Sequence, residues 1–347
     1  MKKFAQALKP AEILAVCGGE YRGSEDLLLQ SVADPAEADP ASIIFWEQEK
    51  YLAVVQNSSA GLIFCTPEGA SKLPGRNLIL HPKPYFGLMR LVSWWLEKCS
   101  DKPQPGIHPS AVMDPSADVG EGVSLGANSV VGRNCRIGAG VCIGANCVLG
   151  DDVTIGAGTR LYPNVVVYPE CEVGSDTIIH SGAVIGADGF GFILMDGMQH
   201  KIPQIGNVRI GNNVEIGANT AIDRGTLSTT LVGDGTKIDN HVQIGHNCRI
   251  GRHCILCAHV GLAGSTILGD YVYLAGQVGA AGHLTIGDRA MIGAQAGVTS
   301  DIPADGRYLG SPAVDANTFK RNFVAQKHLP EIYRNFIKQQ KNHPDKD

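Results

Sequence analysis

The sequence is poor in aromatic residues and contains no long apolar run. Aromatic residues make up only 6% of the 347 positions, so Ile, Val, Leu and Ala must fill most of any core. No stretch approaches the roughly 18 consecutive apolar residues that a transmembrane helix needs. The N-terminal stretch MKKFAQALKPAEIL starts with two lysines, but Lys9, Pro10 and Glu12 interrupt its apolar part. It therefore predicts a first helix over 4–17 and not a signal peptide.

The sequence also lacks a strong charge of either sign. A formal net charge of −5 without a basic stripe argues against a nucleic-acid partner. The ten cysteines, in a chain without a recognisable signal peptide, favour reduced thiols and a cytoplasmic location. The length allows one large domain or two to three smaller ones.

The most regular feature is an aliphatic residue at every sixth position. It runs from 107 to 185, breaks over 186–209, and resumes from 210 to 298 with four extra residues on the way. Only Ala280 in these runs is not a large aliphatic residue. A period of six fits neither an amphipathic helix nor a single alternating strand. It predicts a left-handed parallel β-helix of hexapeptide repeats, in which three short strands make one coil of 18 residues.

Several cysteines share one position, four residues after an inward aliphatic residue: Cys135, Cys147, Cys171, Cys248 and Cys254. Small residues fit that corner, and cysteine packs there as a small hydrophobe. Cys254 and Cys257 form a CxxC pair on a predicted corner, but no second CxxC follows, so a zinc site there is disfavoured.

The two ends of the chain lack the repeat. Residues 1–104 predict a small α/β domain, with a helix over 84–98 and short apolar runs at 42–46, 53–55 and 61–65. The stretch DKPQPG (101–106) predicts a linker to the β-helix of 105–313.

Residues 314–347 predict a helical extension made of two helices, one up to Pro330 and one after it. From 315 to 347 there are seven Lys/Arg and four Asp/Glu, a local charge of +3. Such a segment is either a solvated helical face or a dock for an acidic partner.

His246 departs from the repeat by following a glycine directly. One coil of 18 residues further on lies Gly264, and another coil leads to Gly282, next to His283. His246, Gly264 and His283 therefore share one edge on three successive coils, with the two histidines about 10 Å apart along the axis. A neutral imidazole can accept a proton near neutral pH, and a glycine N–H can approach an oxyanion without a Cβ in the way. Two histidines on one edge thus indicate a catalytic site.

A zinc site on the same scaffold is the rival interpretation. His241 and His246 are five residues apart, as in zinc hydratases of the carbonic anhydrase type, which also need a histidine about two coils upstream. That position, 36 residues before His241, is Ile205, so the metal site lacks a ligand.

Several stretches together resemble the UDP-3-O-(3-hydroxyacyl)glucosamine N-acyltransferases of lipid A biosynthesis. LAVCGGEYRG is similar to the start of that family, and IGADGFGF followed by KIPQIGNVRIG (185–211) looks like its signature insertion. IGANTAIDRGT (216–226) and KIDNHVQIGHN (237–247) strengthen the resemblance, which covers nearly the whole chain.

The resemblance implies a homotrimer with active sites at the subunit clefts and no metal or cofactor. It implies that the N-terminal domain binds the uridine of the nucleotide sugar, with uracil between Phe45 and Tyr51 and a polar contact from Gln48. The donor would be a 3-hydroxyacyl chain on acyl carrier protein. Because that partner is acidic, Lys320 and Arg321 become candidates for its docking site.

The expected reaction is attack of the 2-amino group of UDP-3-O-(3-hydroxyacyl)-glucosamine on the donor thioester, giving UDP-2,3-diacylglucosamine. His246 would be the general base, the Gly264 N–H would stabilise the oxyanion, and His283 would bind near the thioester or the acyl hydroxyl. Further expected substrate contacts are Asp239, Asn240 and Gln243. Asp239 and Asn240 are also candidates to orient the base.

Some positions depart from that family's usual residues. Gln48 stands where the family usually has Asn, Gly245 where it commonly has Ala, and Ala281 where it commonly has Asn. The family's acyl-chain rulers are bulky residues near the stretch 294–300, which is AQAGVTS here and leaves room for a longer chain.

Two further functions stay open. The sister 3-O-acyltransferase that acts on UDP-GlcNAc shares the β-helix and a histidine base, but it lacks the N-terminal α/β domain and the DGFGF insertion. A β-helix that only binds or scaffolds would have no special edge, and a buried His246 would support it.

Overall fold

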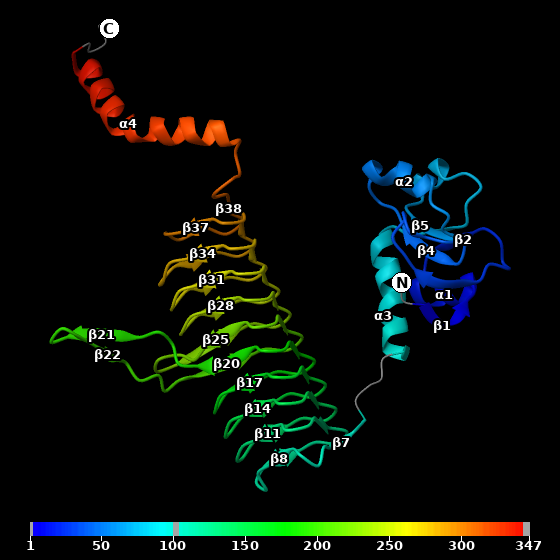
Figure 1. The fold of residues 1–347 in the computed structure, drawn as a ribbon, viewed down its shortest axis with the longest axis horizontal. Helices are drawn as coiled ribbons and strands as arrows, with labels where there is room; N and C mark the ends of the chain where they lie inside the picture. The colour runs from blue at the N-terminus through cyan, green and yellow to red at the C-terminus, as the bar shows by residue number, and fades with distance from the viewer. Residues whose placement is uncertain (1–2, 100–103, 343–347) are drawn as a thin grey trace. The chain divides into compact units, whose positions relative to one another are not determined.

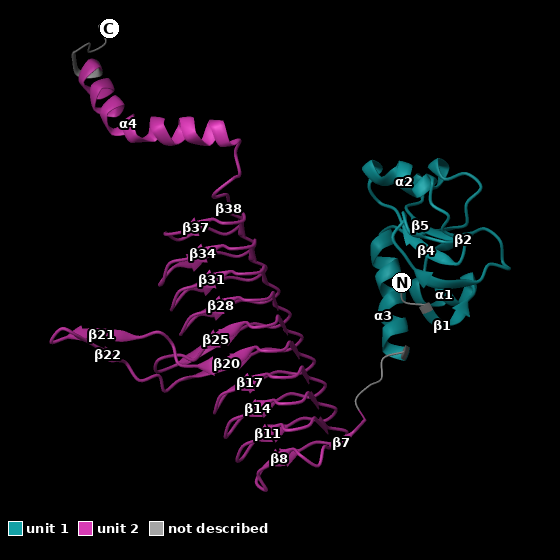
Figure 2. Ribbon diagram, in the orientation of Figure 1, with its two compact units in different colours: residues 1–102 teal, residues 103–347 magenta. Residues whose placement is uncertain are grey.

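The computed structural model describes residues 3–99 and 104–342, and the chain divides into two compact units, residues 1–102 and 103–347 (Figure 2). Of the expected linker 101–106, residues 101–103 lie outside the described residues. Each unit has its own buried apolar core. Within the described part of the chain, no helix combines the length and the apolar character that crossing a membrane requires.

The first unit is an α/β sandwich around one mixed sheet. Its elements are β1 (Lys3–Leu8), α1 (Pro10–Cys17), β2 (Glu20–Arg22), β3 (Leu29–Val32), β4 (Ser42–Phe45), η1 (Glu49–Tyr51), α2 (Leu52–Gln56), β5 (Leu62–Cys65), η2 (Glu68–Lys72), β6 (Leu78–Leu80) and α3 (Pro84–Cys99). The strand order is β1-β3-β4-β5-β6-β2, with β3 to β6 parallel and both edge strands antiparallel to their neighbours. The ring of Phe4 in β1 packs edge-on against Trp95 in α3.

One sequence prediction in this unit is wrong. Residues 3–8 are not the start of a helix but form β1, which pairs with β3, and α1 begins only at Pro10. Proline suits the first turn of a helix and obstructs a helix interior, so it separates the two elements. The apolar run 53–55 lies in α2. The runs at 42–46 and 61–65 contain β4 and β5, and the predicted helix over 84–98 is confirmed as α3.

The second unit is built on a parallel β-helix with three faces, which confirms the predicted fold class (Figure 1). Face 1 consists of β7 (Gly106–Ile107), β10 (Ser124–Leu125), β13 (Cys142–Ile143), β16 (Arg160–Leu161), β19 (Ile178–Ile179), β24 (Glu215–Ile216), β27 (Lys237–Ile238), β30 (Ile255–Leu256), β33 (Tyr273–Leu274), β36 (Met291–Ile292) and β38 (Arg307–Tyr308). Face 2 consists of β8 (Val112–Met113), β11 (Val130–Val131), β14 (Val148–Leu149), β17 (Val166–Val167), β20 (Val184–Ala187), β25 (Ala221–Asp223), β28 (Gln243–Ile244), β31 (Gly261–Leu262), β34 (Gly279–Ala280) and β37 (Gly297–Val298). Face 3 consists of β9 (Asp118–Val119), β12 (Arg136–Ile137), β15 (Thr154–Ile155), β18 (Glu172–Val173), β23 (Asn207–Ile210), β26 (Thr229–Val232), β29 (Arg249–Ile250), β32 (Ile267–Leu268) and β35 (Thr285–Ile286).

The spacing of the repeat reappears as the register between coils. Leu125 pairs with Ile143, one coil of 18 residues further on, and both point into the core. The pairing of Val173 with Ile210 skips 37 residues, because an insertion lies between β20 and β23. The pairing of Ile210 with Val232 skips 22, which places the four extra residues between β25 and β26.

The insertion contains a two-stranded hairpin, β21 (Phe192–Met195) and β22 (Met198–Lys201), which extends away from the β-helix (Figure 1). All eight strand residues of the hairpin are exposed. An isolated hairpin is only marginally stable in water, so its base needs anchoring to the coils.

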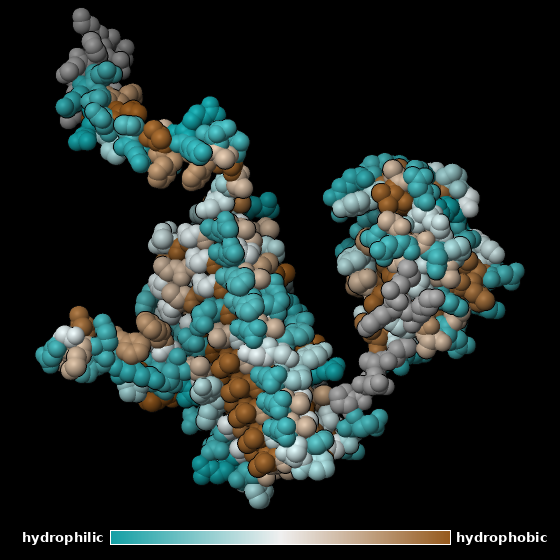
Figure 3. All heavy atoms as spheres, viewed as in Figure 1, coloured by the Kyte–Doolittle hydropathy of each residue, from teal (hydrophilic) through white to brown (hydrophobic). Residues whose placement is uncertain are grey.

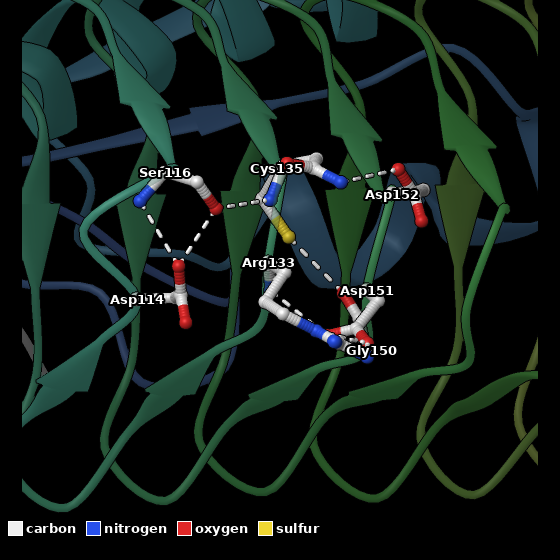
Figure 4. A network of polar contacts seen from close by, with 8 residues as sticks. Asp114, Ser116, Arg133, Cys135, Gly150, Asp151 and Asp152 are labelled. Atoms are coloured by element: carbon white, nitrogen blue, oxygen red, sulfur yellow. Dashed lines mark hydrogen bonds and ion pairs between the residues drawn. The ribbon is translucent and has the colours of Figure 1, made fainter.

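The corners of the β-helix carry ladders of polar side chains from coil to coil (Figure 4). Arg133 forms an ion pair with Asp151, with Nη2 and Oδ2 2.6 Å apart, one coil further on. Cys135 occupies the expected small-residue position, where it is buried and its Sγ donates to the Gly150 carbonyl. The exposed ion pairs contribute little stability individually. All nine cysteines whose side chains the structure describes are free thiols.

The outward side chains of face 2 change character along the β-helix. On the N-terminal coils they form a valine stripe, which Figure 3 shows as a hydrophobic band over β8 to β20: Val112, Val130, Val148, Val166 and Val184. The same row continues through Ala221 and Gln243 and ends in three successive glycines, Gly261, Gly279 and Gly297. We call these three residues the glycine lane.

The C-terminal extension differs from the prediction of two separate helices. One helix, α4 (Ala316–Asn342), contains Pro330 in its interior. It bends midway along its length (Figure 1). Proline removes one backbone hydrogen bond and its ring clashes with the preceding turn, which bends a helix without always ending it.

Candidate active site

The insertion and face 2 line a half-open cavity of about 620 Å³ in the second unit. Its wall includes Gly189 and Phe190 from the insertion, and Gln243, His246 and Gly264 from the β-helix. Its volume falls in the range of small-molecule sites. The two main catalytic candidates from the sequence therefore line one cavity, and His246 is only partly buried.

The imidazole of His246 lies between two glycines. A Cβ at Gly264 would be 2.5 Å from Cε1 and 2.6 Å from Nε2 of the ring. A Cβ at Gly189, on the insertion, would be 2.5 Å from the Cβ of His246 and 2.9 Å from its Cδ2. A side chain at either position would displace the His246 side chain, so the two glycines leave it room.

The hydrogen bonds of Asn247 fix which ring nitrogen of His246 carries the proton. Asn247 Oδ1 accepts the backbone N–H of Thr226 at 3.1 Å, and its Nδ2 donates to Ser228 Oγ at 2.8 Å. The same Oδ1 lies 2.9 Å from Nδ1 of His246. An amide oxygen only accepts, so Nδ1 carries the hydrogen and Nε2 keeps its lone pair. Nε2 is the ring nitrogen beside Gly264, so His246 can act as a base there.

A second polar contact links the base to the insertion. Thr226 Oγ1 lies 3.5 Å from His246 Nδ1 and donates to Gln204 Oε1 at 3.0 Å. Gln204 belongs to the insertion and is only 6% exposed. Buried polar side chains that are hydrogen-bonded hold their neighbours in one arrangement. The insertion and the four extra residues that follow β25 therefore meet beside the imidazole.

Gly264 and His283 follow on the same edge. The Gly264 N–H donates to no acceptor among the residues that the structure describes, whereas its carbonyl accepts the His283 N–H at 3.1 Å. That free N–H can bind an oxyanion next to Nε2 of His246. The side chain of His283 is exposed and lies outside the wall of the cavity.

A buried carboxyl group also lines the cavity. Asp223, in β25, is 9% exposed, and its Oδ1 accepts a hydrogen bond from Gln243 Nε2 at 3.0 Å. Burial raises the pKa of Asp223 above its ordinary value, and the hydrogen bond from Gln243 opposes that rise. Gln243, an expected substrate contact, therefore stands in the cavity beside a carboxyl group that the sequence did not single out.

Asp239 and Asn240 are placed elsewhere, at the end of β27 on face 1, where they line a different cavity. Asp239 Oδ2 accepts the Ala258 N–H at 3.0 Å, and Asn240 Oδ1 accepts the Ala218 N–H at 2.7 Å. Within this chain they tie neighbouring coils together and neither contacts His246. The expectation that one of them orients the base is replaced by Asn247.

The residues of the rival zinc site do not converge. The ring of His241 stacks on His259, with centroids 5.1 Å apart, at the corner between β27 and β28, whereas His246 follows β28. Of the CxxC pair, Cys254 is buried and Cys257 contacts the Tyr273 hydroxyl. Across residues 3–99 and 104–342, no cluster of three or more His, Cys, Asp or Glu side chains could hold a metal.

The expected uridine contacts share a cavity of about 460 Å³ in the first unit. Phe45, Gln48 and Tyr51 all line it. The ring of Tyr51 is half exposed. Trp46 Nε1 donates to the Gln48 carbonyl at 2.8 Å, which fixes the turn between Trp46 and Gln48. A cavity with aromatic walls and polar edges suits a planar heterocycle.

The carrier-protein candidates Lys320 and Arg321 are exposed on α4. Arg321 donates to the Thr318 hydroxyl at 3.3 Å, and neither cation joins an ion pair within the described residues. Both remain available for an acidic partner.

The residues that sequence reasoning missed come mostly from segments without the repeat. Gly189, Gln204 and Thr226 lie in the insertion and the four-residue extension, where no period predicts their positions. The breaks in the register were themselves the available signal, because an interruption of a regular solenoid is a common place for a functional loop.

Three family models match parts of the chain. Residues 26–94 match the model described as UDP-3-O-(3-hydroxymyristoyl) glucosamine N-acyltransferase, LpxD. Residues 229–264 match the bacterial transferase hexapeptide model (six repeats), and residues 107–189 match the GMPPB C-terminal domain.

The chain is also similar to named proteins over most of its length. It is 50% identical to a UDP-3-O-acylglucosamine N-acyltransferase of Neisseria meningitidis serogroup B, over 74% of this chain and 72% of the relative. It is 40% identical to the enzyme of that name from Bordetella pertussis, over 88% of this chain and 87% of the relative. Among solved structures, Arabidopsis UDP-N-acetylglucosamine acyltransferase is 28% identical with a TM-score of 0.55, over 66% of this chain and 82% of that chain.

Proposed function

The chain belongs to the UDP-3-O-acylglucosamine N-acyltransferases, and from that membership we propose that it moves a 3-hydroxyacyl chain from acyl carrier protein to the 2-amino group of UDP-3-O-(3-hydroxyacyl)-glucosamine. The product is UDP-2,3-diacylglucosamine. The observation that carries the proposal is the His246 ring, whose Nε2 has a free lone pair beside the unbonded N–H of Gly264.

The reaction needs one base and one oxyanion donor. The sugar amine attacks the thioester carbonyl, a C–N bond forms, and His246 Nε2 accepts the amine proton. The Gly264 N–H binds the oxyanion of the tetrahedral intermediate. The intermediate then collapses, the C–S bond breaks, and the carrier's sulfur leaves with the proton that His246 holds. We assign to His283, whose backbone N–H donates to the Gly264 carbonyl, a contact with the donor near its thioester or its 3-hydroxyl.

Different groups of the two substrates bind different parts of the protein. The aromatic cavity of Phe45 and Tyr51 holds uracil, with Gln48 at its polar edge. The glycine lane holds the donor's acyl chain, because side chains added at its three positions would point into open space. With strands about 4.8 Å apart, the row from Gln243 to the last glycine of the lane extends roughly 14 Å. Lys320 and Arg321 bind the acidic carrier protein.

The working form is a homotrimer with its sites between subunits. The valine stripe of face 2 gives an apolar surface next to the cavity of His246, and such exposed stripes usually bind another surface. Asp239 and Asn240, remote from His246 in their own chain, contact the substrate in a neighbour's site. The nine free thiols fit a reducing cytoplasm.

The test is acyl transfer by the purified protein, followed by mass spectrometry. The donor is 3-hydroxyacyl carrier protein, and the acceptors are UDP-3-O-acylglucosamine and UDP-GlcNAc. We expect transfer only to the amine, reduced by about 10²–10⁴ in His246→Ala. Transfer to UDP-GlcNAc would overturn the acceptor assignment, and an unchanged rate in His246→Ala would overturn the base.

A further inference from the structure

Asp223 presents an unpaired carboxylate oxygen to the His246 cavity. The residue lines the cavity and is only 9% exposed, and its Oδ1 accepts a hydrogen bond from Gln243 Nε2 at 3.0 Å. Its other oxygen, Oδ2, has no hydrogen bond and no ion pair among the residues that the structure describes. Among those residues, Trp95 Nε1 is the only side-chain atom that is fully buried without a partner. Oδ2 therefore opens into the cavity.

Two cations near Asp223 in the sequence or in the cavity are bound elsewhere. The adjacent Arg224 donates to two backbone carbonyls, at 2.8 and 2.9 Å. Lys201, in the cavity wall, forms an ion pair with Asp188. A buried carboxylate oxygen without a donor is unfavourable, so the cavity suits a ligand that brings a donor of its own.

Asp223 and His246 reach this cavity from successive coils. Ile222 pairs with Ile244, so the residue after Ile222 lies alongside the short stretch that ends in His246. Neighbouring strands are about 4.8 Å apart. Burial raises the pKa of Asp223, and the hydrogen bond from Gln243 and a positive charge on His246 both oppose that rise. Two hydrogen-bond acceptors, Nε2 of His246 and Oδ2 of Asp223, therefore face one cavity.

The number of hydrogens on the nucleophile decides how many of these two acceptors it can satisfy. An amine has two hydrogens and one lone pair, whereas a hydroxyl has one hydrogen. During transfer the amine lone pair forms the C–N bond, one hydrogen moves to His246 as a proton, and the other stays on nitrogen in the product amide. A hydroxyl gives its only hydrogen to the base, and the ester that forms keeps none.

From this count we propose that Asp223 accepts the second N–H of the substrate's 2-amino group and thereby selects an amine over a hydroxyl at that position. The inference rests on the proposed function, because it takes the 2-amine as the nucleophile. Oδ2 holds the hydrogen that stays on nitrogen, which turns the lone pair toward the thioester. A hydroxyl leaves the buried carboxylate without a donor in the transition state, and polar groups left unpaired in this way discriminate strongly between substrates.

The test compares two sugars that differ only at C2. Acyl transfer to UDP-3-O-acylglucosamine and to its 2-hydroxy analogue, UDP-3-O-acylglucose, is measured by mass spectrometry for the wild type, Asp223→Asn and Asp223→Ser. In Asp223→Asn the Gln243 donor holds the amide oxygen, so an NH2 donor replaces Oδ2. We expect the ratio of kcat/KM for the amine to kcat/KM for the hydroxyl to fall about 10- to 100-fold in both variants.

Asp188→Asn is the matched control, because it removes a carboxylate of the same cavity that already has Lys201 as its partner. It should leave the ratio within about threefold of the wild type. Thermal unfolding shows which variants fold, and the two substitutions at Asp223 are read independently. An unchanged ratio in the Asp223 variants would overturn the proposal. So would equal losses for the two sugars, or the same fall of the ratio in Asp188→Asn.

Binding of both sugars, measured by titration calorimetry without donor, separates this inference from the proposed reaction. Tighter binding of the amino sugar by the wild type, lost in the Asp223 variants, supports the inference even if no transfer is seen. In that case the proposed reaction alone fails. Equal affinity of the wild type for the two sugars would count against a role of Asp223 in selecting the amine.

Discussion

Gly264→Ala should disable His246 without disturbing the fold. A methyl group at Gly264 would lie 2.5 Å from Cε1 and 2.6 Å from Nε2 of the ring, whereas ordinary contacts begin at 3.4 Å. Cε1 must therefore move by about 0.9 Å, the difference between 3.4 and 2.5 Å, and it carries the neighbouring Nε2 with it. A misplacement of about 1 Å at a reacting group costs roughly 10² in rate.

The backbone at this position accepts alanine, because the φ angle of Gly264 lies outside the left-handed range. The substitution also keeps the N–H that we assign to the oxyanion. We therefore expect kcat to fall about 10²-fold while Tm changes by no more than a few degrees, since the Cβ displaces one partly exposed ring.

Single-turnover acyl transfer and thermal unfolding measure the two effects. Gly276→Ala is the matched control, because a methyl group there would come no closer than 3.6 Å, to the Ala258 carbonyl oxygen. Gly264→Ala should add no further loss to His246→Ala if both act through the same ring. A kcat within threefold of the wild type, or losses that simply add, would refute the reasoning.

Other substitutions test the surroundings of the base. Asn247→Ala removes the acceptor of the His246 Nδ1 hydrogen and should lower kcat by about 10- to 100-fold, with the tautomer shift visible in ¹⁵N NMR spectra of the ring. Because burial raises the pKa of Asp223 in the folded state, its contribution to stability is full at acid pH and is lost as pH rises through the raised pKa. Asp223→Asn should therefore flatten the decline of Tm with pH above 3.8, and an unchanged profile would contradict the assignment. Gly279→Leu should block the glycine lane and move the preferred donor to shorter chains in a mass-spectrometric competition series, with KM for the sugar unchanged. A wild type with a sharp optimum at short chains would speak against an open lane.

The β-helix was predictable because its pattern is local and repeated. Each inward residue pairs with the one a coil later, so the register of Leu125 with Ile143 follows from the period alone. The first unit has no such redundancy. Whether residues 3–8 form a helix or a strand depends on pairing with β3, which lies more than twenty residues away and leaves no period in the sequence.

In the candidate site, too, the residues that follow the repeat were predictable and those of the insertion were not. His246 and Gly264 belong to coils, and counting 18 residues was enough to place them together. The path of the insertion brings Gly189 to the imidazole and Gln204 to the Thr226 hydroxyl beside it, and no spacing predicts that path. Asn247 is adjacent in sequence to the base, but only the Thr226 N–H on its amide oxygen shows that an acceptor faces Nδ1 of His246.

The skip of 37 residues across the insertion has an evolutionary consequence. All three faces skip by the same amount, and β20 pairs directly with β25, so the coils before and after the insertion already stack on each other. The 19 residues in excess of one coil therefore form an insertion that can be gained, lost or exchanged in one genetic event without repacking the β-helix. The β-helix and the insertion that forms one wall of the cavity are separable modules. Selection can therefore change what the protein acts on while the β-helix stays the same.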